Sequence, residues 1–162
     1  LGADQPAERK FGLTRQCLEV FWKYRHPVSL ITKNSLILRD LDLLAALAAE
    51  RLVHVAISIT TLEEELHQFL EPRTASVRQR LRTVETLTQA GIPVFVMLAP
   101  IIPGLNDHEI FALVKAAADA GVLGVGHTMV RLAKRKYLEG RQMPAYDLDL
   151  HEQHKSPQLR LF

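Results

Sequence analysis

Four short apolar segments alternate with segments of helical periodicity along most of the sequence. The apolar segments lie at residues 28–31, 53–59, 93–98 and 122–130. Apolar residues at three- and four-residue spacing between them predict helices over 12–25, 41–50, 62–69, 75–90 and 106–120. Because such alternation requires a parallel sheet with helices packed against it, the sequence predicts an α/β fold of parallel βα repeats.

The number of repeats limits the architecture. Four strands are too few to close an eight-stranded barrel, which leaves an open sheet, a half barrel or a fragment of a larger fold. We expect residues 1–132 to form the βα-repeat domain and residues 133–162 to form an irregular tail, since periodicity is lost there. Because a helix comes before the first apolar segment, we expect the chain to be part of a larger domain.

Several local features of the helices can be predicted. The helix over 12–25 has one apolar stripe, formed by Leu13, Cys17, Val20, Phe21 and Tyr24. We expect this stripe to be buried, with Cys17 an inert thiol within it. The alternating Arg78, Arg80 and Arg82 predict a solvated helix face.

Capping signals are also present. Asp40 is expected to cap the helix over 41–50. Asn106 and Glu109 form a candidate capping pair for the helix over 106–120. Gly91 and Gly121 directly follow the helices predicted over 75–90 and 106–120, and each is expected to end its helix.

Composition narrows the functional classes. Twenty Lys and Arg against eighteen Asp and Glu give a net charge of +2, which requires no polyanionic partner. The basic run at 131–136 leaves nucleic-acid contact open without supporting it. No apolar run reaches the roughly 18 residues of a membrane span, so we expect a cytoplasmic protein without membrane contact. His151 and His154 read as a solvated pair, and no metal site is expected.

Polar residues follow the predicted strands at their carboxyl ends. Lys33, Ser58 and Arg131 lie at three of these strand ends, and the third strand ends in Ala99-Pro100. Loops and helix starts converge at this edge of a parallel sheet, and an ammonium beside hydroxyls suits a ligand with a carboxylate or phosphate and sugar hydroxyls. A cofactor-free lyase or aldolase with Lys33 as a Schiff-base nucleophile is a rival hypothesis, although it needs a desolvated lysine.

Four motifs carry a family resemblance. They are Val-Ser-Leu-Ile-Thr-Lys-Asn at 28–34, Val-Ala-Ile-Ser-Ile-Thr-Thr at 55–61, Leu-Glu-Pro-Arg-Thr at 70–74 and Gly-Ile-Pro-Val-Phe-Val-Met-Leu-Ala-Pro-Ile-Ile-Pro-Gly-Leu-Asn-Asp at 91–107. In this order they resemble the radical S-adenosylmethionine (SAM) proteins related to spore photoproduct lyase, often labelled DNA repair photolyase-like. The resemblance covers roughly residues 5–132, and the last five residues also resemble the end of many such chains.

The resemblance implies a partial TIM-like barrel and a parent enzyme that uses SAM and a [4Fe–4S] cluster. In that family a Cys-x-x-x-Cys-x-x-Cys loop holds the cluster, whereas this sequence has one cysteine, Cys17. We therefore expect a portion of the enzyme without cluster ligands and with no cofactor bound by itself. By the same resemblance, Lys33, Ser58 and the Ala99 backbone match SAM-binding positions.

Looser matches and an alternative remain. Glu71 and Arg131 resemble substrate-side positions more weakly, and no residue of this chain is expected to be catalytic. The alternative is a non-catalytic truncated remnant that acts through partner contacts. Because an open sheet has unpaired edge strands, a homo-oligomer formed through these edges is expected.

Overall fold

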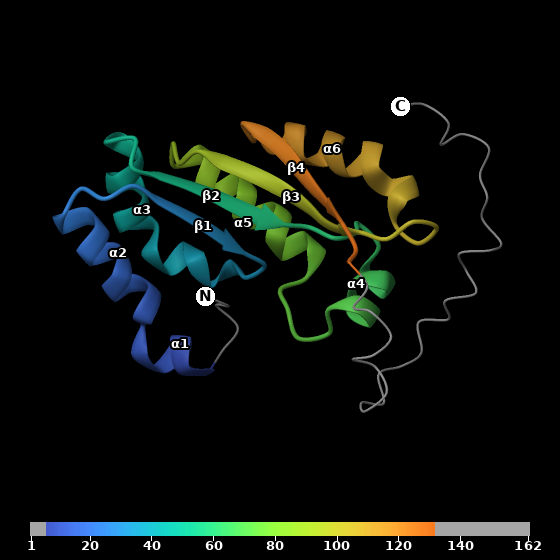
Figure 1. The fold of residues 1–162 in the computed structure, drawn as a ribbon, viewed down its shortest axis with the longest axis horizontal. Coiled ribbons are helices and arrows are strands. Elements are labelled where there is room, and N and C mark those ends of the chain that lie inside the picture. Colours follow the sequence, from blue (N-terminus) through green and yellow to red (C-terminus); the bar gives the residue numbers. More distant parts are fainter. Residues whose placement is uncertain (1–5, 132–162) are drawn as a thin grey trace.

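A single parallel sheet organises the computed structural model, which describes residues 6–131 (Figure 1). Its strands are β1 (Val28–Thr32), β2 (Val53–Ser58), β3 (Val94–Ile101) and β4 (Gly124–Met129), in the order β1-β2-β3-β4. All three neighbouring pairs are parallel. The predicted α/β fold of parallel βα repeats is confirmed, and β3 continues three residues beyond its expected end.

Helices connect the strands. They are α1 (Pro6–Phe11), α2 (Leu13–Lys23), α3 (Leu41–Ala49), α4 (Glu64–Leu70), α5 (Val77–Gln89) and α6 (Ile110–Asp119). Two 3₁₀ segments, η1 (Ser35–Asp40) and η2 (Asp107–Glu109), come directly before α3 and α6. The tail predicted for 133–162 lies outside the described residues.

The hydrophobic core lies between one face of the sheet and the helices (Figure 1). Alternate residues of the central strands supply the sheet side, among them Val55, Ile57, Val94 and Val96. The helices contribute Leu44 and Leu47 of α3, Val84 and Leu87 of α5, and Leu113 of α6. Burial of each such side chain stabilises the fold by about 1.5–3 kcal/mol.

The opposite face of the sheet carries exposed side chains in the described part of the chain. His54 and Phe95 lie there, and on β1 the side chains of Ser29 and Ile31 are exposed. The expectation that segment 28–31 would be buried on both faces is therefore wrong for one face. Successive side chains of β1 point to opposite faces of the sheet, so Val28 and Leu30 pack against the core while Ser29 and Ile31 lie on the exposed face.

The first predicted helix differs most from expectation. Gly12, at φ +59°, separates α1 from α2, and Cys17 is exposed together with most of the predicted stripe. Leu18 is fully buried instead. The orientation of α2 follows from the packing of Leu18 in the core, which contributes more than the partly exposed ion pairs of Arg15 with Asp40 at 3.3 Å and Asp42 at 2.8 Å.

Helix ends match the predictions in part. Gly91 and Gly121 have positive φ angles of +75° and +82° and end α5 and α6 as predicted. Asp40 makes no capping hydrogen bond to α3, because its carboxylate accepts from Arg15 and Arg39. The sequence analysis did not predict the capping box between Ser76 and Gln79 that begins α5.

Asn106 and Glu109 are not the predicted capping pair. Asn106 makes no capping hydrogen bond, and the side chains of both residues bond to the loop after β2 instead. Each therefore ties the β3–α6 connection to the β2–α4 connection.

Candidate functional site

The three predicted SAM-binding residues lie along one edge of the sheet. Lys33 directly follows β1, Ser58 ends β2, and Ala99 lies near the end of β3. These strands are adjacent and parallel, so their carboxyl ends share that edge. The fold thus brings together residues that are up to 66 positions apart in the sequence.

Glu71 and Thr60 connect these positions. The Lys33 ammonium forms an ion pair with Glu71 Oε1. The Thr60 hydroxyl lies 3.0 Å from the same carboxylate oxygen and 3.1 Å from the carbonyl oxygen of Ala99, and donates to one of them at a time. We call Lys33, Thr60, Glu71 and Arg80 the Glu71 cluster.

Arg80 completes the cluster from α5. Its side chain is 1% exposed, and its Nη1 donates to the carbonyl oxygen of Ser58 at 2.9 Å. Its Nη2 forms an ion pair with Glu71 and donates to the Thr74 hydroxyl, while its Nε donates to the Ala75 carbonyl oxygen at 3.0 Å. Arg80 therefore fixes the end of β2 to the loop that carries Glu71.

The prediction of a solvated arginine face is wrong for Arg80 and right for Arg78 and Arg82, which are exposed. Arg80 lies three residues after Val77 and four before Val84, both of them buried. Its position on the buried stripe of α5 was the signal that could have identified it.

Electrostatics favour an anionic ligand group near Lys33. Burial raises the pKa of Glu71, but the hydrogen bond from Lys33 and the charge of Arg80 together hold that pKa below its ordinary value. Two cations and one carboxylate leave a surplus of one positive charge in the cluster. Because Arg80 is buried and the Lys33 side chain is 35% exposed, Lys33 is the cation that a ligand can reach.

His67 is a buried residue that the sequence analysis did not single out. Its Nε2 lies 3.1 Å from Arg80 Nη2 and 3.2 Å from the Thr74 hydroxyl. The two hydrogens of Arg80 Nη2 have Glu71 and Thr74 as acceptors, so either Nδ1 or Nε2 can carry the proton of the neutral His67 ring. Among the described residues, this Nδ1 is a buried atom without a hydrogen-bond partner, and Glu64 Oε1 lies 3.6 Å from it.

Asn106 fixes the other side of the Thr60 loop. It is 2% exposed, and its Nδ2 donates to the carbonyl oxygens of Thr60 at 2.7 Å and Pro100 at 3.0 Å. Its Oδ1 accepts from the backbone N–H of Ile102. Thr60 and Ala99 are thereby held at the positions that link them to Glu71.

The two weaker candidates have different placements. Glu71 is the centre of the cluster, whereas Arg131 follows β4 and is exposed. The hydrogen bonds and ion pairs found for the cluster within residues 6–131 do not include Arg131. The structure therefore brings Glu71 next to Lys33 and leaves Arg131 apart.

An apolar cavity of about 260 Å³ lies elsewhere, between α2, β1 and η1. Leu18, Phe21, Leu30 and Ile37 are among its lining residues, and Lys33, Ser58 and Ala99 are not. Glu8, Arg39 and Asp40 also line it, and the charge of Arg39 is paired with both of these carboxylates. We therefore place the candidate site at the Glu71 cluster.

The chain's residues do not fit an iron–sulfur cluster. Cys17 is the one cysteine of the sequence, and it lies exposed on α2, away from the strand ends. An iron–sulfur cluster of this kind needs three cysteine thiolates, and one cysteine cannot supply them.

Of the helices in the described part, none is long and apolar enough to cross a membrane.

Curated relatives of this chain are uncharacterized proteins. A protein of Mycobacterium tuberculosis is 33% identical over 123 residues, which cover 75% of this chain and 36% of that protein. A protein of Methanocaldococcus jannaschii is 36% identical over 107 residues, covering 66% of this chain and 40% of that protein. One of Acidianus two-tailed virus is 33% identical over 96 residues, covering 56% and 31%. The chain thus spans about two fifths or less of the length of these relatives.

A family model places the chain. The model of the radical SAM superfamily matches residues 15–117, which include β1, β2 and β3 with the helices between them. This range also contains Lys33, Thr60, Glu71, Arg80 and Ala99. The four-stranded parallel sheet agrees with part of the TIM-like barrel of that family, and the chain belongs to the radical SAM superfamily.

Proposed function

We propose that this chain supplies part of the SAM-binding rim of a radical SAM enzyme related to spore photoproduct lyase. The observation that carries the proposal is the Glu71 cluster, which connects Lys33, Ser58 and Ala99 from three adjacent strands. These three strand-end residues are thus linked by a single network of ion pairs and hydrogen bonds. A network of this kind holds its members in a fixed geometry, as a binding site requires.

Each residue has a defined role in the proposal. The Lys33 ammonium pairs with the carboxylate of the SAM methionyl group, the Ser58 side chain contacts the ribose, and the Ala99 backbone lies beside the adenine. Glu71 is a positioning residue, since its carboxylate holds the Lys33 ammonium at the end of β1. The surplus positive charge of the cluster supports an anionic group at Lys33.

The cluster ligands must come from sequence outside this chain. SAM together with a [4Fe–4S] cluster supplies radical chemistry, and the lone Cys17 cannot hold that cluster. We propose that the parent polypeptide carries a three-cysteine motif before residue 1. The short share of the relatives' length that this chain covers supports the proposal.

The test uses the complete product of the gene. We expect the sequence encoded before Leu1 to contain the three-cysteine motif, and the anaerobically reconstituted protein to cleave SAM. Lys33→Met should raise the SAM concentration needed for half-maximal cleavage by tenfold or more, whereas the exposed Arg78→Met should leave it unchanged. A gene without the cysteine motif, or equal behaviour of the two variants, would contradict the proposal.

A second candidate is a non-catalytic protein that self-associates. It is favoured by the edge strand β1, where Ile31 is 64% exposed. Exposed edge strands pair readily with a second chain. We propose a dimer formed through this edge, which does not require the radical chemistry.

The Schiff-base hypothesis is less well supported. A nucleophilic lysine must be neutral, and a desolvated site without a counter-ion favours that form. Lys33 is instead 35% exposed and forms an ion pair with the Glu71 carboxylate, so it has neither the desolvation nor the absence of a counter-ion that this hypothesis needs.

A further inference from the structure

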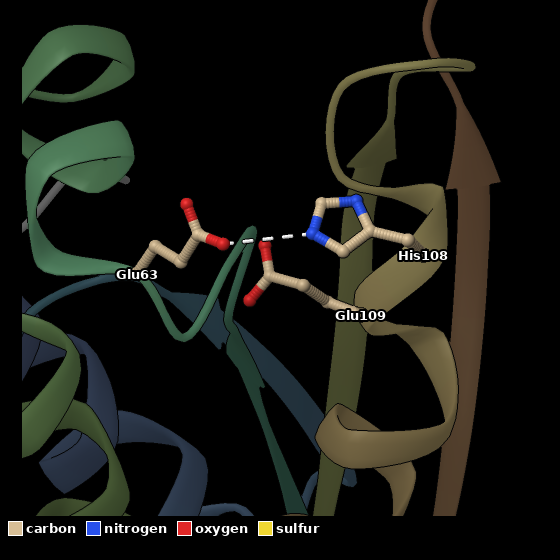
Figure 2. A group of neighbouring side chains, drawn as sticks. All are labelled: Glu63, His108 and Glu109. Carbon is tan, nitrogen blue, oxygen red and sulfur yellow. Dashed lines mark ion pairs between the residues drawn. The ribbon is translucent and has the colours of Figure 1, made fainter.

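Three metal-ligating side chains meet beside the strand ends. Glu63 lies directly before α4, and His108 and Glu109 lie in η2 after β3. One ligand atom from each lies within 4.8 Å of the other two. Figure 2 shows the Glu63 carboxylate and the His108 ring directed toward one another, with Glu109 beside the line between them.

We propose that Glu63, His108 and Glu109 form a binding site for a divalent transition-metal ion such as Zn²⁺. His108 Nε2 lies 3.5 Å from Glu63 Oε1. Bonds of about 2.0–2.1 Å in a tetrahedral site place neighbouring ligand atoms about 3.3–3.5 Å apart. This pair therefore has the separation that a shared ion requires.

Glu109 provides a second and independent indication. It is 6% exposed, and no Lys or Arg among residues 6–131 forms an ion pair with it. A buried carboxylate without a compensating charge is unfavourable. The ion pair of His108 is made with Glu63 and not with Glu109. A bound cation would supply the charge that Glu109 lacks.

The oxygens of Glu109 are already oriented. The Thr61 hydroxyl donates to Oε1, and the backbone N–H of Leu62 donates to Oε2 at 2.7 Å. Each carboxylate oxygen keeps a further lone pair for a metal. Hydrogen bonds to a ligating carboxylate are the usual second layer of a metal site, because they fix its direction.

The exposed ligands have the freedom to close on an ion. The side chains of Glu63 and His108 are 59% and 62% exposed. Shifts of about 1.5 Å or less in these two side chains would bring all three atoms, now within 4.8 Å of one another, to the spacing of a tetrahedral site. An exposed ion pair contributes little to the free energy of unfolding, so the contact between His108 and Glu63 is not needed to hold the fold together.

The donor set selects the ion. One imidazole nitrogen and two carboxylate oxygens suit Zn²⁺, and Mn²⁺ should bind more weakly because affinities follow the Irving–Williams order. Three protein ligands leave the fourth position of Zn²⁺ to water. This site shares no side chain with the Glu71 cluster and does not depend on SAM binding.

The proposal is tested by a calorimetric titration of the chelator-treated 162-residue chain with Zn²⁺. We expect one equivalent to bind at this site. His108→Ala and Glu63→Gln should each weaken it by tenfold or more, and Thr61→Val, which removes a hydrogen bond to Glu109, by about tenfold. The control is His26→Ala. His26 is exposed and lies before the amino end of β1, so its replacement should leave the affinity for Zn²⁺ unchanged. Circular dichroism establishes that each variant is folded.

His151 and His154 require their own variant, because they offer imidazoles at helical spacing. The double substitution of both residues by alanine should leave one equivalent of Zn²⁺ bound through His108. Co²⁺ in place of Zn²⁺ should give the intense visible absorption of a tetrahedral site, lost in His108→Ala. Equal affinity in His108→Ala and the unaltered chain, or loss only in the double variant, would overturn the proposal.

Discussion

Lys33 and Glu71, 38 residues apart in the sequence, form an ion pair that joins the end of β1 to the loop after α4. The Glu71 carboxylate is also paired with Arg80 of α5. One anion thus balances two cations from different elements. The orientation of the reachable cation, Lys33, depends on a buried carboxylate that is itself held by Arg80 and Thr60.

Replacement of Arg80 should have a large effect on stability. Arg80→Met leaves the buried carboxylate of Glu71 with one cation and removes the donor to the Ser58 carbonyl oxygen. Removal of one partner from a buried pair costs about 3–5 kcal/mol in the free energy of unfolding. Urea denaturation should show this loss, whereas Arg78→Met on the exposed face of the same helix should change stability by about 0.5 kcal/mol or less. Similar effects of the two variants would show that Arg80 has no special role.

Glu71 should make stability depend on pH. Its pKa in the folded chain lies below the ordinary value of 4.5, so its contribution is fully present above about pH 4.5 and is lost as the pH falls through the folded pKa. Glu71→Gln should therefore be less stable than the unaltered chain at neutral pH. The difference between their free energies of unfolding should narrow below about pH 4.5. A difference that stays constant into strong acid would mean that the Glu71 carboxylate is not stabilised by its cations.

Self-association should depend on β1. Ile31→Lys places a charge at an exposed apolar position of the edge strand, and charges there oppose pairing between chains. Light scattering at high micromolar concentration should show a dimer for the unaltered chain and a monomer for the variant. Phe111→Lys, at an exposed position on α6, is the control and should stay dimeric. A monomeric unaltered chain would contradict the edge-mediated dimer.

The parallel sheet was predictable because β1, β2 and β3 are short apolar runs and the helices between them repeat apolar residues at helical spacing. The helix α1 was not predicted, since its sequence has no apolar periodicity. Helix orientation was less accessible. Helix α2 has apolar residues on two adjoining faces, and which face is buried depends on the core residues that Leu18 packs against, which are distant in sequence. A pattern within one helix carries no information on such a partner.

The candidate site was predictable in its strand-end residues and not in its supporting residues. Lys33, Ser58 and Ala99 follow or end apolar runs, which local sequence reveals. Arg80 bonds to the Ser58 carbonyl oxygen, 22 positions away, and Asn106 to that of Thr60, 46 positions away, and such contacts depend on the tertiary structure. Both were assigned surface or capping roles because polar residues are most often exposed.

SAM binding by the isolated chain should be weak. Lys33 is partly exposed and Ser58 is buried, at 5% exposure, so polar contacts from the two contribute no more than roughly 1–3 kcal/mol, against an association cost of at least about 4 kcal/mol. The remaining contacts would come from the cluster and from sequence outside this chain. Anaerobic reconstitution of the chain with iron and sulfide should accordingly produce no iron-dependent absorbance, and a stoichiometric cluster signal would contradict the ligand count.

The proposed SAM-binding rim is tested most directly by a residue-resolved nuclear magnetic resonance titration of the complete, anaerobically reconstituted gene product with SAM. We expect progressive shifts of the amide signals at and beside Lys33, Ser58 and Ala99. In Lys33→Met, but not in Arg78→Met, these shifts should require a SAM concentration tenfold higher or more. Absence of shifts at these three strand ends, or shifts that persist unchanged in Lys33→Met, would contradict the assignment of this edge of the sheet to SAM.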